Sequence, residues 1–385
     1  MIPELEFHSI SRSLGVPLPH VEKDYVMGWL VWGLAQEAFL RERLILKGGN
    51  CLRKLYFPDT RFSDDLDFTT TEVLTGVAFR PHLERILGLV SETSGISFST
   101  ERTRVDEAQT PDPEEQALDA RVYFRGMAGD SSVVFRVKFD VSPYERIVLP
   151  LQDQPLIHGY SDANVCKTGV RGYALEEVLA EKLRSWIQRT RARDLFDAAK
   201  IIASGRGTVR KAEILRVFLQ KTLFKGIPNV ARDELLSREK FSVASGHWLT
   251  SIVCPINALI VAANAIELFV QFVTALFAPE MTGATGFRTQ QGAVGAVRQI
   301  PATIREAIIS AGRNRQLLTL TYSGLTRLVE PYALKFKVRK DGFAGEYFYG
   351  YDRTKDQSIK SFLLNKVQAA QARAEAFTPR SYVDF

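Results

Sequence analysis

Residues 44–68 read LILKGGNCLRKLYFPDTRFSDDLDF, and this stretch sets the expectations for the rest of the chain. An apolar run ends in Gly48 and Gly49, where the lack of side chains lets the backbone approach another group closely. Asp65 and Asp67 follow and alternate with apolar residues, which in a strand puts both carboxylates on one face. Two such charges repel unless a cation lies between them. The stretch therefore predicts a Mg²⁺ site beside a phosphate-binding turn.

Each part of this signal is weak when it stands alone. An Asp-x-Asp pair is common in solvated turns, and a glycine pair is equally unspecific. Their order in this chain strengthens the prediction, because each part has the strand context that it needs. The stretch is not a Walker A loop, since no Lys-Ser or Lys-Thr pair closes a Gly-x-x-x-x-Gly run.

A third carboxylate is expected on a second strand. Residues 121–125 and 131–141 are predicted to form a hairpin, and the second arm alternates apolar and polar residues. Its polar face carries Asp140, which is our candidate for the third metal ligand. The alternative, an amphipathic strand whose polar face is simply solvated, stays open on this pattern.

A lysine lies within the apolar stripe of the helix predicted over 175–187. Lys182 is seven residues after Leu175 and therefore on the same side of the helix. Lysine is rarely buried without a partner, so Lys182 either extends to solvent or reaches a cleft that holds an anion, and we favour the cleft. Arg193 and Asp194 follow and are candidates to orient Lys182 or the nucleotide; the alternative is an ordinary pair of surface charges.

The composition is that of a globular protein with a basic end. Residues 301–385 contain 14 Lys and Arg against 8 Asp and Glu, so this part accounts for the whole net charge of +6. Such an excess favours a polyanionic partner. The 3 cysteines suggest neither a disulfide framework nor a zinc site, and the N-terminus shows no signal-peptide pattern, so a cytoplasmic location is expected.

The length of 385 residues predicts two or three domains. We expect a domain over 1–240, an apolar helical segment over 241–280, a linker over 281–300 and a basic β-rich module over 301–385. Within the first domain, helices are expected over 1–43 and 78–92, a short strand over 94–100 and a loop over 104–115.

The segment 252–278 imitates a membrane span. Its polar residues form one stripe on an otherwise apolar helix, which favours a buried helix or a contact in a homo-oligomer and argues against a membrane. The stripe consists of Asn257, Asn264, Glu267 and Gln271.

The first 240 residues or so resemble the AbiEii/AbiGii-type toxin nucleotidyltransferases of the polymerase-β-like superfamily. The pieces that carry the resemblance are KGGNCLRKLY (47–56), RFSDDLDF (61–68), LEEVLAEKL (175–183) and RDLFD (193–197). Many members of the superfamily have serine at the second glycine position, whereas this chain has Gly49 and could use Ser63 instead. The resemblance implies an α+β fold with a helical C-terminal part and a partner antitoxin.

Residues 315–383 resemble a WYL domain, a small Sm-like β-barrel. The matching pieces are Tyr322, RLVEPY (327–332), EYF (346–348) and FTPR (377–380). The name-giving Trp-Tyr-Leu is replaced by EYF, and Lys360 and Lys366 stand where that family often has arginines. Because lysine lacks the bidentate geometry of arginine, a ligand-binding module and a structural or dimerising appendage both stay open.

The two resemblances imply an enzyme that transfers a nucleoside monophosphate from an NTP to RNA. The acceptor expected from the family is the 3′ end of tRNA, and the setting is a toxin–antitoxin or phage-defence system. Asp65, Asp67 and Asp140 would hold Mg²⁺, and Lys182 would neutralise the triphosphate. Gly48, Gly49 and Ser63 would contact the phosphates. The alternatives are a regulator whose nucleotidyltransferase domain is not catalytic, and a phosphotransferase that acts on a small molecule or a protein.

Overall fold

The computed structural model describes the whole chain except residues 108–116, 130–131, 144, 226, 228–231, 279–301, 323, 339–343, 355–356, 381–382 and 384–385. The predicted linker at 281–300 lies outside the described residues. The chain divides into two compact units. The larger consists of Met1–Lys221 with Ala231–Thr285, and the smaller of Thr222–Val230 with Gly286–Phe385. The domain boundaries expected from the sequence remain predictions.

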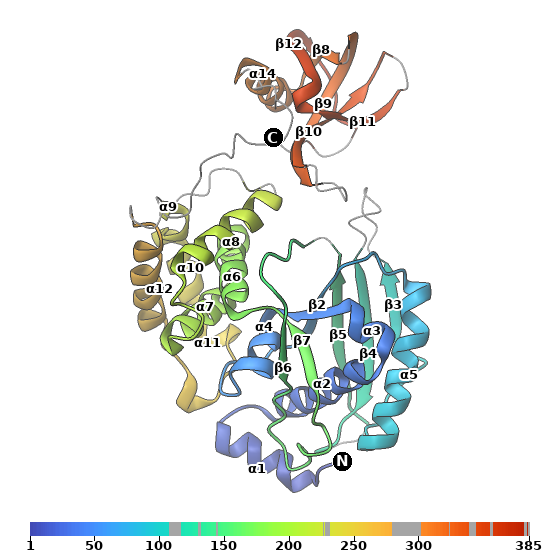
Figure 1. Cartoon of the computed structure of the whole chain (residues 1–385), viewed down its shortest axis with the longest axis vertical. Helices are drawn as coiled ribbons and strands as arrows, with labels where there is room; N and C mark the ends of the chain where they lie inside the picture. Colours follow the sequence, from blue (N-terminus) through green and yellow to red (C-terminus); the bar gives the residue numbers. More distant parts are fainter. Residues whose placement is uncertain are drawn as a thin grey trace. The chain divides into compact units, whose positions relative to one another are not determined.

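The larger unit is built on a mixed seven-stranded sheet with the order β3-β4-β5-β2-β1-β7-β6 (Figure 1). The strands are β1 (Leu44–Lys47), β2 (Asp65–Thr70), β3 (Arg104–Glu107), β4 (Leu118–Arg125), β5 (Val134–Ser142), β6 (Gln152–Pro155) and β7 (Gly169–Gly172). β2 pairs antiparallel with β1 and parallel with β5, so it lies in the interior of the sheet. The predicted hairpin is confirmed as β4 and β5.

Helices at the N-terminus pack against this sheet, as the apolar content of residues 1–43 led us to expect. They are α1 (Glu4–Leu14), α2 (Leu18–Gln36) and α3 (Ala38–Arg43). α2 is buried on nearly all sides and packs against α5 (Gly76–Ser94). Thr75 caps α5 by accepting a hydrogen bond from the Ala78 N–H, and Gly95 ends it in the left-handed conformation.

A helical half completes the larger unit (Figure 1). It comprises α6 (Leu175–Arg189), α7 (Ala192–Ser204), α8 (Lys211–Phe224), α9 (Arg232–Leu235), α10 (Arg238–Gly246), α11 (Trp248–Ser251) and α12 (Ala262–Leu276). Trp186 of α6 lies at its centre, with ring centroids 5.6 Å from Phe241 and 6.0 Å from Phe269. Its indole N–H donates to the Leu235 carbonyl. The helices therefore share one aromatic core.

Three local predictions were wrong in detail. The apolar segment is not one helix over 252–278, because Pro255 interrupts it and α12 begins at Ala262. The strand expected over 94–100 is only a bridge between Phe98 and Phe124. Part of the expected loop, Arg104–Glu107, pairs with β4 as β3.

The segment Ile256–Leu276 passes a test for membrane spans by length and composition, which for one helix is weak evidence. Asn264, Glu267 and Gln271 of the polar stripe are exposed on α12, while Phe269, Phe272 and Leu276 are buried. α12 packs against α7, and Phe269 contacts Trp186 of α6 and Phe241 of α10.

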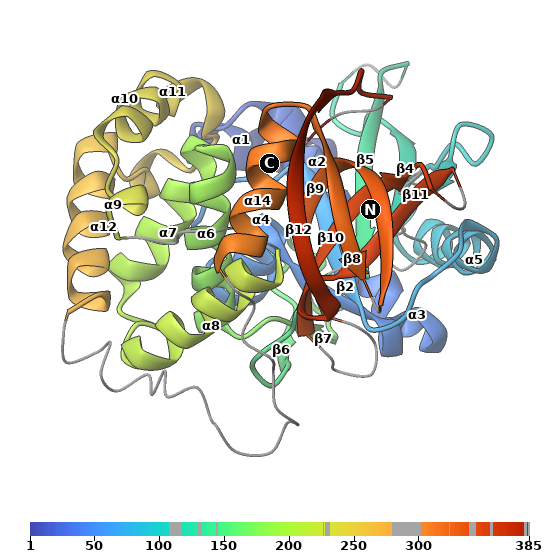
Figure 2. The ribbon, with the colours of Figure 1, turned by 90° about the horizontal axis from the view of Figure 1, so that it is seen from above.

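The smaller unit contains α14 (Ala302–Arg313) and an antiparallel sheet of order β11-β10-β9-β8-β12 (Figure 2). The strands are β8 (Gln316–Tyr322), β9 (Leu325–Val338), β10 (Ala344–Asp352), β11 (Ser358–Leu363) and β12 (Val367–Ala376). α14 covers the sheet, and Ile308, Leu318, Val329 and Phe348 share its core. In the described residues no pairing joins β11 to β12, so a closed Sm-like barrel is not shown.

Candidate active site

Three carboxylates meet on two neighbouring strands of the large sheet. Asp65 and Asp67 alternate with buried Leu66 on β2, as predicted. β5 runs parallel to β2, and its Asp140 is the direct partner of Asp67 in the register. Adjacent strands lie about 4.8 Å apart, so Asp67 and Asp140 are close neighbours. The structure thus places the three side chains that the sequence singled out as metal ligands on two paired strands, with Asp67 beside Asp140 and Asp65 beside Lys138.

The glycine turn lies against the same carboxylates. Gly48 begins the short helix α4 (Gly48–Cys51) and has a φ of 70°, a conformation that side chains disfavour. A Cβ atom at this position would also collide with the Asp67 carboxylate. Asn50 in α4 donates its side-chain N–H to the Asp65 carbonyl at 2.7 Å. The turn and β2 are therefore held together at the point where the acidic residues begin.

Gly49 leaves room for a different pair of side chains. A Cβ atom there would lie 2.7 Å from Nη2 of Arg61 and 2.8 Å from Oγ of Ser63. Ser63 therefore lies beside the glycine turn, as its proposed phosphate contact requires, and it is buried. Arg61 is buried as well, and it donates two hydrogen bonds of 2.8 Å to the carboxylate of Asp197.

The acidic strand face is electrostatically unfavourable as it stands. Burial, followed by repulsion from Asp140 and Asp65, raises the pKa of Asp67 to about 6, although Lys47 and Lys182 oppose this. Burial and the neighbouring Asp64 also raise the pKa of Asp65. A cation bound between these carboxylates would relieve both effects. The raised pKa values are what unneutralised metal ligands would show.

Lys182 lies in a buried ion-pair cluster on the helical half. Its Nζ is 3.2 Å from Asp194 and 2.8 Å from Asp197, both on α7. Burial alone would lower the pKa of Lys182, but those two carboxylates raise it above its usual value. Arg189 adds two hydrogen bonds to Asp194, of 2.9 and 3.1 Å. Lys182 is thus buried with two carboxylates of the chain as partners, while the predicted contact with an anion in a cleft stays a prediction; its charge also acts on Asp67.

Arg193 lies near the acidic strand through its contact with Asp64. One of its guanidinium nitrogens lies 3.9 Å from Asp64, the residue just before Asp65. Lys23 and His20 of α2 also face Asp64, at 3.1 and 3.7 Å. Asp64 is half-exposed, so the basic side chains around it, Arg193, Lys23 and His20, lie near the surface. Arg193 is thus close to the acidic strand but contacts neither Asp65 nor Asp67 in the described contacts.

Sequence reasoning missed three residues of this site. Lys47 is buried at the end of β1, pairs with Glu145 at 3.8 Å and is the strongest influence that lowers the pKa of Asp67. Arg61 and Asp197 form the buried bidentate pair. A signal existed for Lys47, because it directly precedes the glycines. Asp197 follows Asp194 by three residues and hence shares its helix face.

The residues fit a divalent metal ion by their chemistry. Among the described residues no three acidic, histidine or cysteine side chains are positioned closely enough to count as a formed metal site. Asp65 and Asp67 nevertheless share a face, and Asp140 is paired with Asp67 across the strands. Carboxylate oxygens are the ligands that Mg²⁺ prefers. These three side chains would hold it.

An acidic pair on a central strand, beside a glycine turn and with a buried lysine on the neighbouring helix, suits an enzyme that handles phosphates. The family model described as nucleotidyl transferase AbiEii toxin, type IV TA system, matches residues 30–251. The chain belongs to this family and is a nucleotidyltransferase toxin of a type IV toxin–antitoxin system. The family implies a cognate antitoxin. It also favours the enzyme over a non-catalytic regulator.

Solved structures include distant relatives. The nucleotidyltransferase toxin MenT4 from Mycobacterium tuberculosis is 21% identical, with 72% of this chain and 92% of that chain covered and a TM-score of 0.47. JHP933 from Helicobacter pylori is 16% identical, with 70% and 96% covered and a TM-score of 0.43. No curated protein matches the chain at a significant level. The WYL-like character of residues 315–383 remains a prediction.

Proposed function

We propose that this toxin transfers a nucleoside monophosphate from an NTP to the 3′ hydroxyl of an RNA, with tRNA as the first acceptor to test. The observation that carries the proposal is the register of β2 and β5, which pairs Asp67 with Asp140 beside the Gly48 turn. Such a convergence of carboxylates suits an NTP and a hydroxyl acceptor. A cytoplasmic location fits both substrates.

Each residue has a distinct task in this proposal. Asp65, Asp67 and Asp140 hold Mg²⁺, which when bound supplies positive charge at the attacking and leaving oxygens. The backbone of the Gly48–Gly49 turn and the hydroxyl of Ser63 bind the phosphates. Close approach of the phosphates is feasible there because neither glycine carries a side chain.

The helical half supplies positive charge that is already oriented. Lys182 acts on the charge that develops on the triphosphate, and Asp194 holds its ammonium group in place at 3.2 Å. Arg193 contacts the nucleotide after leaving Asp64. The basic residues of 301–385 add affinity for RNA, which would weaken as the salt concentration rises.

The direct test is to incubate the protein with each of the four labelled NTPs, Mg²⁺ and total tRNA. We expect label in tRNA from the intact protein, and none from Asp65→Ala or Lys182→Ala. The matched control is Asp153→Asn, an exposed acidic residue on β6 of the same sheet. Label on protein, or on no macromolecule, would favour the phosphotransferase or the regulator instead. Full activity in either variant would refute the role given to that residue.

A further inference from the structure

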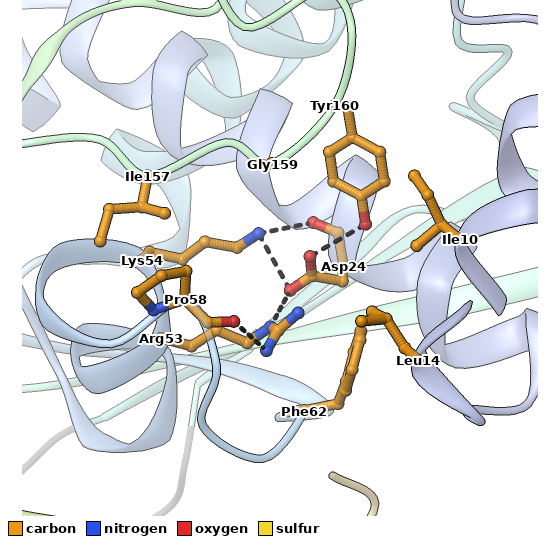
Figure 3. A pocket seen from close by; sticks show the side chains of 10 residues that line it. All are labelled: Ile10, Leu14, Asp24, Arg53, Lys54, Pro58, Phe62, Ile157, Gly159 and Tyr160. Carbon is orange, nitrogen blue, oxygen red and sulfur yellow. Dashed lines mark hydrogen bonds and ion pairs between the residues drawn. The ribbon is translucent and has the colours of Figure 1, made fainter. Parts of the chain in front are cut away.

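A second cavity lies away from the acidic strand face and is lined by both charged and apolar side chains. It is about 220 Å³ in volume and is enclosed by α1, α2, the π-helix Leu52–Tyr56 and the segment around residues 157–160 (Figure 3). Its lining residues are Ile10, Leu14, Asp24, Arg53, Lys54, Pro58, Phe62, Ile157, Gly159 and Tyr160. None of them has a task in the proposed reaction.

The charged lining is unbalanced. Arg53 and Lys54 are both buried, and both pair with the single carboxylate of Asp24, at 2.7 and 2.9 Å. Tyr160 donates a third hydrogen bond to that carboxylate. The cavity wall therefore has two basic side chains against one acidic side chain, although burial lowers the pKa of Lys54 while Asp24 opposes this. A surplus positive charge in a buried place is unfavourable unless an anion offsets it.

Neighbouring acidic side chains do not remove this surplus. Asp162 accepts hydrogen bonds from Tyr25 and Trp29 and contacts His158, and it does not line the cavity. Asp59 pairs with Lys200 on the surface. Burial lowers the pKa of His158 to about 4, so this neighbour adds no charge at neutral pH.

Arg53 also keeps donors that the described residues do not use. Its Nε binds Asp24, and Nη1 donates to the carbonyls of Pro58 and Thr60. Nη2 has no partner among the described contacts, and in Figure 3 a terminal guanidinium nitrogen without a dashed line points toward Leu14 and Phe62. Arg53 is only 7% exposed, and its guanidinium lies over the Phe62 ring, 3.7 Å from the centroid, so this nitrogen belongs to a largely buried side chain in the cavity lining. It is placed to bind a ligand.

We propose that this cavity binds a small organic carboxylate, with its acid group on Nη2 of Arg53 and its apolar part against Ile10, Leu14 and Ile157. The unpaired Nη2 of Arg53 offers an anchoring donor, which suits a carboxylate group. The cavity volume of about 220 Å³ lies below the roughly 300–1,000 Å³ of drug-sized ligand sites and therefore favours a small ligand. Ile10 and Leu14 lie across from Arg53 and Lys54 in Figure 3, whereas Ile157 lies beside Lys54, so the lining suits an amphipathic ligand.

The test uses benzoate as the probe on the full chain, with isoleucine methyl groups labelled for NMR. We expect benzoate to shift the Ile10 and Ile157 methyl signals saturably, at least tenfold more tightly than benzyl alcohol or acetate. Benzyl alcohol keeps the ring without the charge, and acetate keeps the charge without the ring. Equal binding of benzoate and benzyl alcohol would overturn the proposal, as would unmoved methyl signals, which mean that the cavity holds water only.

A pair of variants on α1 sharpens the result. Ile10→Trp fills the cavity and should weaken benzoate binding at least tenfold, whereas Leu5→Trp, on an exposed position of the same helix, should leave it unchanged. Unchanged binding in Ile10→Trp would place the ligand elsewhere and refute the site. If that variant does not fold, the comparison of the three probes on the unmodified chain decides alone.

Discussion

The two sides of the candidate site differ in how the chain compensates buried charge. The strand face carries Asp65, Asp67 and Asp140, and the helix face carries Lys182, Asp194 and Asp197. On the strand face, Asp67 lies among other carboxylates, and its pKa is raised to about 6. On the helix face, Asp194 is less exposed than Asp67, at 2%, yet its ion pairs with Lys182 and Arg189 lower its pKa to about 2. Burial alone would raise both values. The difference therefore comes from the partners that each face provides within the chain.

This contrast distinguishes the strand face, whose carboxylates a bound ligand would stabilise, from the helix face, whose ion pairs stabilise the fold. The strand face stores an unfavourable interaction that a bound cation would relieve. The ion pairs of the helix face form within the chain, because Asp194 and Asp197 hold Lys182, Arg189 and Arg61, and these three basic groups outnumber the two carboxylates. Lys182 therefore influences a triphosphate through a fixed position and cannot move far to meet it.

The largest expected effect comes from neutralising the strand face. Asp67→Asn should lower nucleotidyl transfer by about 10⁴-fold, which corresponds to about 5 kcal/mol of lost transition-state stabilisation. The same change should raise the unfolding free energy at pH 7 by about 3 kcal/mol, because it removes a carboxylate with a raised pKa. Label incorporation and urea denaturation measure the two effects. Loss of stability in this variant would contradict the contrast between the two faces.

A smaller effect, on the free energy of unfolding, is expected from removing one carboxylate charge from the helix face. Asp197→Asn leaves Arg61 and Lys182 without their shared partner and should cost about 4 kcal/mol of unfolding free energy. The surface control is Asp59→Asn, whose ion pair with Lys200 is half-exposed and should be worth less than about 0.5 kcal/mol. Similar costs for the two variants would show that the buried cluster is not a stabilising element.

The pH dependence of stability should show both faces at once, with effects of about 2–3 kcal/mol each. Asp67 has a raised pKa, so its protonation should stabilise the fold as the pH falls from about 6 to about 4. Asp194 has a lowered pKa, so its contribution is complete above about pH 4 and is lost as the pH falls toward 2. Thermal unfolding in EDTA as a function of pH measures this profile. Asp67→Asn should remove only the gain in stability between about pH 6 and pH 4.

The sequence predicted the strand face well because its signal is local and periodic. Alternation along two strands placed Asp65, Asp67 and Asp140 on one face, and the structure pairs those strands. The pairing of Arg61 with Asp197 escaped prediction, since it joins residues 136 positions apart. No short-range pattern reports such a contact.

Helix boundaries and strand ends were predicted less well, for two different reasons. The apolar run at 252–278 suggested one helix, although Pro255 within the run is a local signal for the interruption that the structure shows. β3 forms where a polar loop was expected, because pairing with β4 supplies its hydrogen bonds. At β3, tertiary contacts outweighed local preference.

The space left by Gly49 has a consequence for how this chain can vary over time. A larger residue there would push into Arg61 and Ser63, and Arg61 cannot withdraw without abandoning Asp197. A serine at this position would require a rearranged arginine. Substitutions at Gly49, Arg61 and Asp197 should therefore be correlated among homologous chains.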